Sequence, residues 1–316
     1  GLCPFHHDTS PSLVITPEKN LWHCLGACNE GGSAIDWVMK SQGLGFREAV
    51  EALLDEHPVG AVIPEGPEKS PPSLLTGEGQ ALLRQVVDHY HRTLKKTPAA
   101  LAYLQKRGLL RDELIDAFQL GFADRSLLRL LPPNDTQAGA TMRERLQEIG
   151  LLRRDGGELF AGAIVVPVMD ESGVITELYG RRIDNQKERR HLYLPGPHRG
   201  IFNPLALKSE EVILCEAFFD ALTWWTSGFG NVTSGFGANG FNDELLEAIA
   251  SSGIKRVFHA QDGDEAGEKA AHAVAEKLAA RGIENYRLPL PSGMDVNEFA
   301  LRYAPARESL ARLLSS

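Results

Sequence analysis

Three of the four cysteines lie in one short segment, CPFHHDTSPSLVITPEKNLWHCLGAC, which runs from Cys3 to Cys28. Two residues separate Cys3 from His6 and three separate Cys24 from Cys28, so the segment offers one imidazole and three thiolates. That donor set suits a tetrahedral zinc ion. The β-prone residues between the two pairs predict a hairpin that brings them together, and the glycine in CLGAC permits a tight turn. Because a segment this small cannot build its own core, we predict a closed, structural zinc site.

Two further histidines, His7 and His23, compete with His6 for the imidazole position, and we expect both to be solvent-exposed or packing residues. The alternative interpretation is a group of ordinary buried cysteines beside a surface histidine. Two paired half-sites at zinc-like spacing favour the metal site over that alternative. Cys215 lies in an apolar, strand-like run, where we expect it to be a small core residue.

Helical apolar spacing follows in SAIDWVMK and FREAVEALLDEH, and the next stretch, PVGAVIPEGPEKSPPS, is rich in proline and lacks periodicity. Helical patterns resume at ALLRQVVDHYHRTL and AALAYLQKRGLLRDELIDAFQLGF. The two strand-like runs of AGAIVVPVMDESGVITELYGRRI then predict a hairpin. We therefore divide the chain into a zinc-binding domain (1–57), a linker (58–75), the first part of a larger core (76–208), a parallel-sheet domain (209–295) and a C-terminal helical segment (296–316).

The composition sets broad limits on the class of protein. At 316 residues, with 24% charged and 43% hydrophobic residues, the chain has the balance of a globular protein of two or three domains. No apolar run approaches membrane-spanning length, and so few cysteines indicate a reducing, cytoplasmic compartment. The net charge of −9 argues against indiscriminate nucleic-acid binding but leaves local patches open. Because a candidate ligand stands at position 3, we expect the natural N-terminus to lie upstream.

In the last third, strand-like and helical patterns alternate, from EVILCE and FFDALTWWTSG through KRVFHAQ and DEAGEKAAHAVAEKLAARG to NYRLPL. This alternation predicts a parallel sheet covered by helices, and ligands collect at the carboxyl ends of such strands. Acidic residues stand at these ends, where they repel one another unless cations are bound. Oxygen ligands select Mg²⁺ or Mn²⁺, the ions of metal-assisted phosphoryl transfer. The candidate ligands are Glu216, Asp220, Asp262, Asp264 and Asp295.

VILCEAFFDAL followed by QDGDEAGEKAA resembles the Toprim domain, whose pattern is a strand-end glutamate and then Asp-x-Asp after a later strand. Three more tracts resemble one branch of that superfamily, the bacterial DnaG-type DNA primases. CPFHHDTSPSL…HCLGAC is similar to their CHC2-type zinc finger. YLQKRGLLRDELIDAFQLGFA is similar to the opening of their polymerase core, and VVPVMDESGVITELYGRRI to the hairpin before their Toprim unit. The four tracts follow the family's order and span most of residues 3–299.

The resemblance implies an α/β fold: a small zinc-ribbon-like domain linked to a primase core that contains a Rossmann-like parallel Toprim sheet. It implies a structural zinc ion and catalytic Mg²⁺ or Mn²⁺, with single-stranded DNA and nucleoside triphosphates as partners and no membrane. A replicative helicase would bind through regions that are not in this chain. Carried over by position, it implies zinc ligands at Cys3, His6, Cys24 and Cys28, catalytic carboxylates at Glu216, Asp262 and Asp264, and further metal ligands at Asp220 and Asp295.

Between Arg181 and Arg199, six Lys or Arg residues stand against two acidic ones. This stretch is a candidate for contacts with phosphates, although a solvated loop explains its middle equally well. Arg181 falls where the family has a nucleotide- or template-contacting arginine, and Arg182 follows it. Tyr193 is a candidate for stacking on a base, against the more common alternative of packing.

Several positions depart from the family pattern. The second cysteine pair is spaced by three residues where two are usual, and Ala217 replaces the glycine that commonly follows the catalytic glutamate. Asn297 stands where a further aspartate is usual, which would weaken one metal site. Leu192 and Pro195 replace a lysine and an asparagine. FAGAIVVPV also lacks the arginines of the family's corresponding stretch.

The expected activity is that of a DNA primase, the synthesis of short RNA primers on single-stranded DNA by metal-dependent nucleotidyl transfer. Two alternatives stay open. One is a Toprim nuclease that uses the same metals with water as the attacking group. The other is a DNA-binding adaptor that has lost catalysis.

Overall fold

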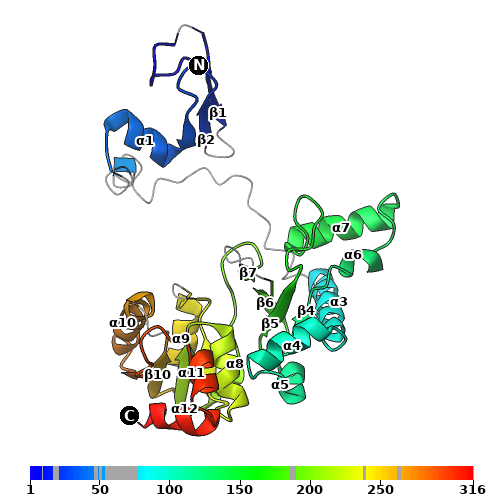
Figure 1. Cartoon of the computed structure of the whole chain (residues 1–316), viewed down its shortest axis with the longest axis vertical. Helices are drawn as coiled ribbons and strands as arrows, with labels where there is room; N and C mark the ends of the chain where they lie inside the picture. The colour runs from blue at the N-terminus through cyan, green and yellow to red at the C-terminus, as the bar shows by residue number, and fades with distance from the viewer. Residues whose placement is uncertain are drawn as a thin grey trace. The chain divides into compact units, whose positions relative to one another are not determined.

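The computed structural model describes residues 1–8, 10–16, 21–45, 49, 52–53, 77–184, 190–237, 240–261 and 265–315. Its backbone divides into two compact units, residues 1–69 and 70–316, and each is described by itself (Figure 1). The predicted linker lies outside the described residues, as does most of the predicted helix FREAVEALLDEH.

Among its described residues, the first unit contains a three-stranded antiparallel sheet that is followed by the helix α1. Leu13 pairs with Cys24 across the first two strands, so the predicted hairpin is confirmed. The helix begins with a capping box between Ser33 and Asp36, and it ends at Gly43 in the left-handed conformation (φ 68°). The elements are β1 (Leu13–Thr16), β2 (Leu21–Cys24), β3 (Gly31–Ser33) and α1 (Ala34–Gln42).

The second unit contains an antiparallel sheet in the order β4-β5-β6-β7. The predicted hairpin forms its two central strands, joined by a turn in which Asp170 Oδ1 accepts hydrogen bonds from the N–H groups of Ser172 and Val174. The short fourth strand was not predicted, because three residues are too few to show alternation. The strands are β4 (Gly121–Phe122), β5 (Ala163–Met169), β6 (Ile175–Arg182) and β7 (His191–Tyr193).

Helices cover this antiparallel sheet, and the longest of them buries the apolar face that the pattern ALLRQVVDHYHRTL predicts. Its residues Leu83, Val87 and Tyr90 join Phe160 and Val165 in one hydrophobic cluster. The helix at 137–149 was not predicted, because few of its residues are apolar. The helices are α3 (Gly77–Leu94), α4 (Pro98–Lys106), α5 (Asp112–Ala117), α6 (Leu127–Leu130) and α7 (Gln137–Ile149).

The second unit also contains the predicted parallel sheet, in the order β11-β10-β8-β9. Both of its faces are buried. In β8, Val212 and Leu214 face one hydrophobic cluster while Ile213 and Cys215 face another. The predicted strand NYRLPL ends at Arg287, because the prolines that follow cannot donate to the ladder. The strands are β8 (Glu211–Cys215), β9 (Val232–Ser234), β10 (Arg256–Ala260) and β11 (Glu284–Arg287).

Two groups of helices flank the parallel sheet (Figure 1). Leu246, in the helix at 243–251, and Leu278, in the helix at 265–279, share a hydrophobic cluster with Val257. Phe218, Phe299 and Leu310 belong to the cluster on the opposite face of the sheet. No helix in the described part of the chain is both long and apolar enough to cross a bilayer. These elements are α8 (Phe218–Thr226), α9 (Asp243–Ser251), α10 (Glu265–Ala279), α11 (Val296–Arg302), α12 (Ala306–Leu314) and the 3₁₀ helix η4 (Pro204–Lys208).

Candidate metal centres and nucleic-acid interface

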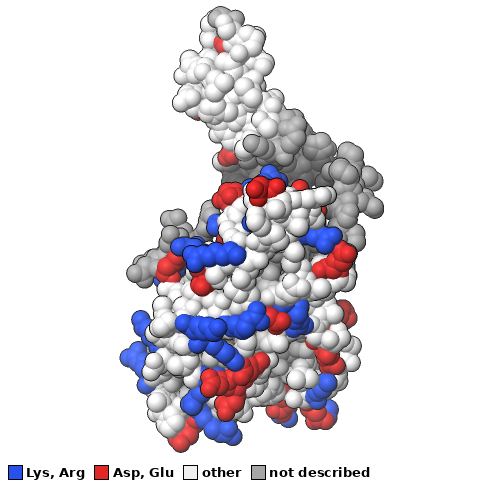
Figure 2. Space-filling view, turned by 90° about the vertical axis from the view of Figure 1, so that its right-hand side faces the viewer, with Lys and Arg blue, Asp and Glu red and all other residues white. Residues whose placement is uncertain are grey.

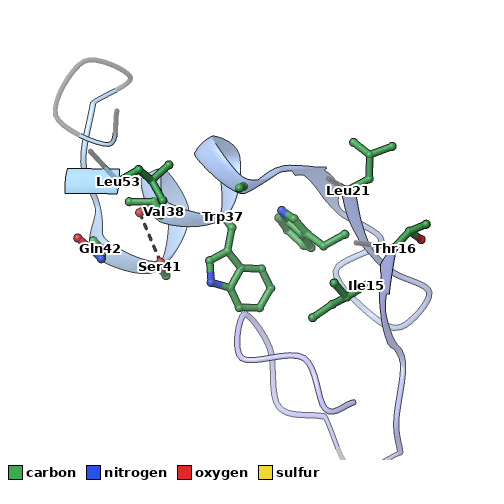
Figure 3. Close-up of a pocket in the computed structure, with 10 residues that line it drawn as sticks. Ile15, Thr16, Leu21, Trp37, Val38, Ser41, Gln42 and Leu53 are labelled. Atoms are coloured by element: carbon green, nitrogen blue, oxygen red, sulfur yellow. Dashed lines mark hydrogen bonds between the residues drawn. The ribbon is translucent and has the colours of Figure 1, made fainter. Parts of the chain in front are cut away.

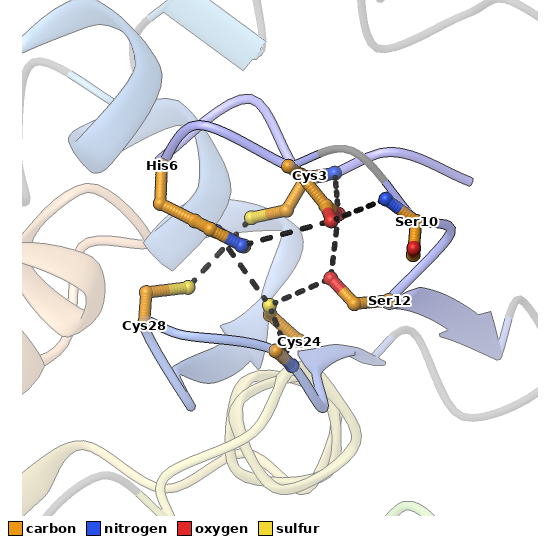
Figure 4. Close-up of polar contacts among 8 residues, drawn as sticks. Cys3, His6, Ser10, Ser12, Cys24 and Cys28 are labelled. Atoms are coloured by element: carbon orange, nitrogen blue, oxygen red, sulfur yellow. Dashed lines mark hydrogen bonds and ion pairs between the residues drawn. The ribbon is translucent and has the colours of Figure 1, made fainter.

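The four sequence-predicted zinc ligands come together in the first unit (Figure 4). One ligand atom from each of Cys3, His6, Cys24 and Cys28 lies within 4.8 Å of all the others. The two thiols of Cys3 and Cys28 are 3.7 Å apart, and Cys24 Sγ lies 3.9 Å from His6 Nδ1. Three sulfurs and one imidazole nitrogen at this separation fit a tetrahedral zinc ion.

Hydrogen bonds around the cluster prepare one thiol for metal binding. Burial alone would raise the pKa of Cys24, but its hydrogen bond with Ser12 Oγ and the one that it accepts from the Gly26 N–H lower this pKa to about 7. Burial raises the pKa of Cys28 to about 11. Gly26 is needed for a close approach, since a Cβ there would lie 2.6 Å from Ser12 Oγ. The predicted tight turn is present, with the Asn29 N–H donating to Gly26 O at 3.1 Å, but glycine is required here by the close approach to Ser12 and not by a left-handed backbone.

Sequence reasoning missed Asp8, which links the ligand-bearing loops. Its carboxylate accepts hydrogen bonds from the Cys3 N–H at 2.8 Å and from Ser12 Oγ at 2.6 Å, and these bonds lower its pKa to about 2. Asp8 Oδ1 also lies 3.8 Å from His6 Nε2. Carboxylates that orient metal-binding histidines are common around such sites. The signal in the sequence was an acidic residue two positions after a candidate ligand, in a turn-rich stretch.

The aromatic residues of the first unit pack together. Trp22 is 6% exposed, lies 5.1 Å from the Phe5 ring and 5.2 Å from the Trp37 ring, and donates its indole N–H to Ser33 O. Trp22 therefore packs in the interior of this unit. Beside these rings lies a cavity of about 410 Å³ that Ile15, Leu21 and Val38 help to line (Figure 3).

At the parallel sheet, the strand register brings two chain segments to one edge. β8 and β10 are parallel neighbours, and Cys215 pairs with Ala260 at their carboxyl ends. Glu216 and Gln261 are the next residues along each strand, so Asp262 follows directly on the segment beside Glu216. Asp262 and Asp264 themselves lie outside the described residues. Glu216 is half-buried and its Oε2 is shielded from solvent, so it offers a hard oxygen donor of the kind that Mg²⁺ and Mn²⁺ take.

The other two predicted carboxylates have structural contacts. Asp220, in the first turn of α8, is 4% exposed, and its Oδ1 accepts the Asn297 N–H at 3.1 Å. Asp295 caps the N-terminus of α11 by accepting the Glu298 N–H. The Asp220 contact anchors α11 beside the helix that follows Glu216, whereas the Asp295 contact caps α11 itself.

Asn297, which replaces the usual aspartate, is a buried connector. It is 1% exposed, and its Oδ1 accepts from Arg107 Nη1 at 3.0 Å. Its Nδ2 donates to Arg107 O and to Thr223 Oγ1, each at 2.8 Å. Because the amide is fully engaged with the polypeptide, Asn297 joins the end of α4 to α8 and α11.

Replacing Asn297 with Asp is expected to lower the free energy of unfolding by about 1–3 kcal/mol, because the two hydrogen bonds that Nδ2 donates are lost in a buried place. Chemical denaturation measures this change. Asn134→Asp is the control: Asn134 is exposed, and its expected effect is within about 0.5 kcal/mol. An Asn297→Asp variant of unchanged stability with tighter Mn²⁺ binding would show instead that the position is a weakened metal ligand.

Arg181 and Arg182 end β6, but their surroundings differ. Arg182 forms an ion pair with Asp184, with 3.0 Å between Nε and Oδ1, and this carboxylate largely neutralises its charge. Arg181 Nη1 lies against His191 Nε2, directly across the strand pair. Partial desolvation of the ring and the charge of Arg181 lower the pKa of His191 to about 4. His191 is therefore neutral and accepts from Arg181.

Aromatic contacts connect this strand pair to the parallel sheet. The Tyr193 ring lies 4.3 Å from His198 and 6.2 Å from Phe236, and Gly237, next in the chain, donates its N–H to Glu216 O at 3.0 Å. The structure thus brings Tyr193 to the loop that contacts Glu216.

Elsewhere on the second unit, basic and acidic side chains are mixed. Arg145 pairs with Glu78 and Lys95 with Asp116. The face shown in Figure 2 carries Lys and Arg side chains interleaved with Asp and Glu. Lys187 and Arg189, in the middle of the basic stretch, lie outside the described residues. Within the described residues, the basic stretch comprises Arg181, Arg182, Arg190 and Arg199, of which Arg190 and Arg199 are exposed, and Tyr193 packs against the core.

Family models match three consecutive parts of the chain. The CHC2 zinc finger matches residues 1–66, the N-terminal domain of the DNA primase catalytic core matches 89–207, and a Toprim-like domain matches 213–300. A DNA primase of Chlamydia trachomatis is 31% identical over 99% of this chain and 53% of its own length, and one of Listeria monocytogenes is 29% identical over 97% and 52%. The chain belongs to the DnaG-type primase family.

Solved structures of DnaG-type primases agree with this assignment. The zinc-binding and RNA polymerase domains of the Aquifex aeolicus primase are 27% identical, with a TM-score of 0.65 over 100% of this chain and 77% of that one. A DnaG catalytic core with 20% identity and a TM-score of 0.63 shares the fold over 75% of this chain. The chain spans about half the length of the curated primases named above.

Proposed function

We propose that this chain synthesises short RNA primers on single-stranded DNA by metal-dependent nucleotidyl transfer. In that reaction the 3′-hydroxyl of one nucleotide attacks the α-phosphate of the next, and pyrophosphate leaves. The observation that carries the proposal is the register of β8 and β10, since it brings Glu216 beside the segment that leads into Asp262 and Asp264. The same core in DnaG-type relatives, one of which is described as bound to single-stranded DNA, supports it.

Each candidate residue has a role in this proposal. Glu216, Asp262 and Asp264 hold divalent cations, Mg²⁺ or Mn²⁺, with Asp220 and Asp295 supporting them. Such ions neutralise charge that develops on the phosphates and align the attacking and leaving oxygens. Arg181, held by neutral His191, is aimed at a triphosphate or a template phosphate, and Tyr193 at a base. Arg182 is the second basic candidate, limited by its pairing with Asp184.

The first unit has a separate role. Cys3, His6, Cys24 and Cys28 hold zinc, which fixes the fold of a segment with few buried side chains of its own. We propose that this unit helps to hold the template. A replicative helicase, if one binds, would use regions of the relatives that this chain does not span.

The experiment is a primer-synthesis assay on single-stranded DNA with all four ribonucleotides and Mg²⁺ or Mn²⁺. Short RNA products are expected. Cleavage of the DNA without incorporation would instead establish the nuclease alternative, which uses the same metals with water as the attacking group. DNA binding with neither reaction, and without Mn²⁺ binding, would establish the adaptor.

A further inference from the structure

Arg287, the last residue of β11, connects the two ends of the segment that carries Asp262 and Asp264. Its Nη1 donates to Gln261 O at 2.8 Å, and Gln261 directly precedes Asp262. Its Nη2 and Nε both donate to Glu268 Oε1, at 2.8 and 3.2 Å, and Glu268 stands in the first turn of α10. One planar guanidinium therefore connects the end of β10 to the start of α10.

The hydrogen bond from Arg287 to Gln261 O lies beyond the last backbone hydrogen bond between β10 and β11. The ladder between β10 and β11 ends where Leu288 N–H donates to His259 O. Among the described residues, no backbone N–H reaches Gln261 O, so Arg287 supplies its hydrogen bond. The Gln261 side chain is 4% exposed, and its Oε1 has no hydrogen-bond partner in the part of the chain that the structure describes. Among the described residues, Arg287 is thus the donor that holds the backbone of Gln261.

The carboxylates at this edge need such an anchor. Glu216, Asp262 and Asp264 carry like charges that repel one another at short range. A metal site is precise only when the groups around its ligands fix them. An exposed ion pair by itself adds little to stability, and Glu268 is 63% exposed. The role of Arg287 therefore lies in geometry more than in overall stability.

We propose that Arg287 is a positioning residue for the divalent-metal site, acting through Gln261 and Glu268. The proposal rests on the proposed function, because it concerns the same metal ions. Arg287 holds Gln261, directly before Asp262, to Glu268 in the first turn of α10, and so fixes the two points between which the Asp262–Asp264 segment runs. Lysine cannot replace it fully, since one ammonium group lacks the planar fork that bonds two partners at once.

Three substitutions test this role in the full chain. Arg287→Met removes every donor, Arg287→Lys keeps the charge without the fork, and Glu268→Gln keeps a neutral acceptor for the guanidinium. The matched control is Arg281→Met. Arg281 also pairs with a glutamate between two elements of this sheet domain, Nη1 lying 2.9 Å from Glu247 Oε2, but the pair joins α9 to the end of α10 instead of the metal segment.

The first measurement is Mn²⁺ binding by calorimetry, without nucleotides. Arg287→Met is expected to weaken binding roughly tenfold, as groups that orient ligands do, with Arg287→Lys and Glu268→Gln affected less and Arg281→Met unchanged. The second is the Mg²⁺ dependence of primer synthesis, where the half-saturating concentration should rise in the same order. Circular dichroism reports whether each variant is folded. If Arg287→Met does not fold, Arg287→Lys is the variant that tests the role.

The outcomes separate this inference from the proposed function. A wild-type chain that binds Mn²⁺, together with Arg287 variants of unchanged Mn²⁺ affinity, would overturn the positioning role alone. If Arg281→Met weakened Mn²⁺ binding to the same degree, the effect would be general destabilisation, and the positioning role of Arg287 would again be overturned. A wild-type chain that binds no Mn²⁺ would overturn the proposed function itself, and this inference with it.

Discussion

Replacing Glu216 with Gln is expected to lower primer synthesis by about 100-fold or more while the chain stays folded. The substitution keeps the shape of the side chain but removes one negative charge from the edge where cations bind. Electrostatic groups aimed at developing charge in a shielded site contribute on the order of 100- to 1,000-fold each. One oxygen of Glu216 is shielded from solvent, so water cannot screen the loss. Primer yield per unit time on single-stranded DNA measures the effect.

The same strand provides the control. Glu211 is the first residue of β8, at the opposite end from Glu216, and it pairs with Arg256. Glu211→Gln removes the same charge from the same strand, and we expect primer synthesis to stay within about twofold because surface ion pairs contribute little. Asp262→Ala should be as inactive as Glu216→Gln. Full activity in Asp262→Ala or in Glu216→Gln would refute the proposed catalytic edge.

The parts of the fold that the sequence predicted correctly have local causes. The strand and helix alternation of the last third shows each element's own periodicity, and the register of β8 and β10 then brings Glu216 next to Gln261. The candidate zinc ligands could be predicted because the members of each pair lie close together in the sequence. The structure groups the predicted His6, and neither His7 nor His23, with the three cysteines.

Apart from the local hydrogen bonds of Asp8, the contacts that sequence reasoning missed are long-range. Asn297 forms hydrogen bonds with Arg107, a residue 190 positions earlier. The sequence suggested that this asparagine replaces a metal ligand, whereas in the structure it connects buried elements. Arg287 has no local feature that marks it, since an arginine at a strand end is ordinary. Its contacts depend on the pairing of β11 with β10 and on where α10 begins. No periodicity reports such contacts.

Removing zinc with a chelator is expected to unfold the first unit and to leave the second unit folded. Binding of a structural zinc ion contributes about 10–16 kcal/mol to small zinc-binding segments, far more than the few buried side chains here can supply. Trp22 and Trp37, which pack on each other, would become exposed, and tryptophan emission should shift to longer wavelength. The second unit has separate hydrophobic clusters and should keep its thermal transition.

A pair of neighbouring histidines makes this prediction specific. His6→Ala removes one of the four grouped ligands, so zinc retained after dialysis should fall below that of the wild-type chain, and limited proteolysis should cut within residues 1–45. His7→Ala changes an exposed residue outside the group and should retain zinc as the wild-type chain does. Equal zinc retention in both variants would mean that His6 is not a ligand. Loss of zinc in His7→Ala alone would mean that His7 is the ligand in place of His6, since the two imidazoles are adjacent in the same loop.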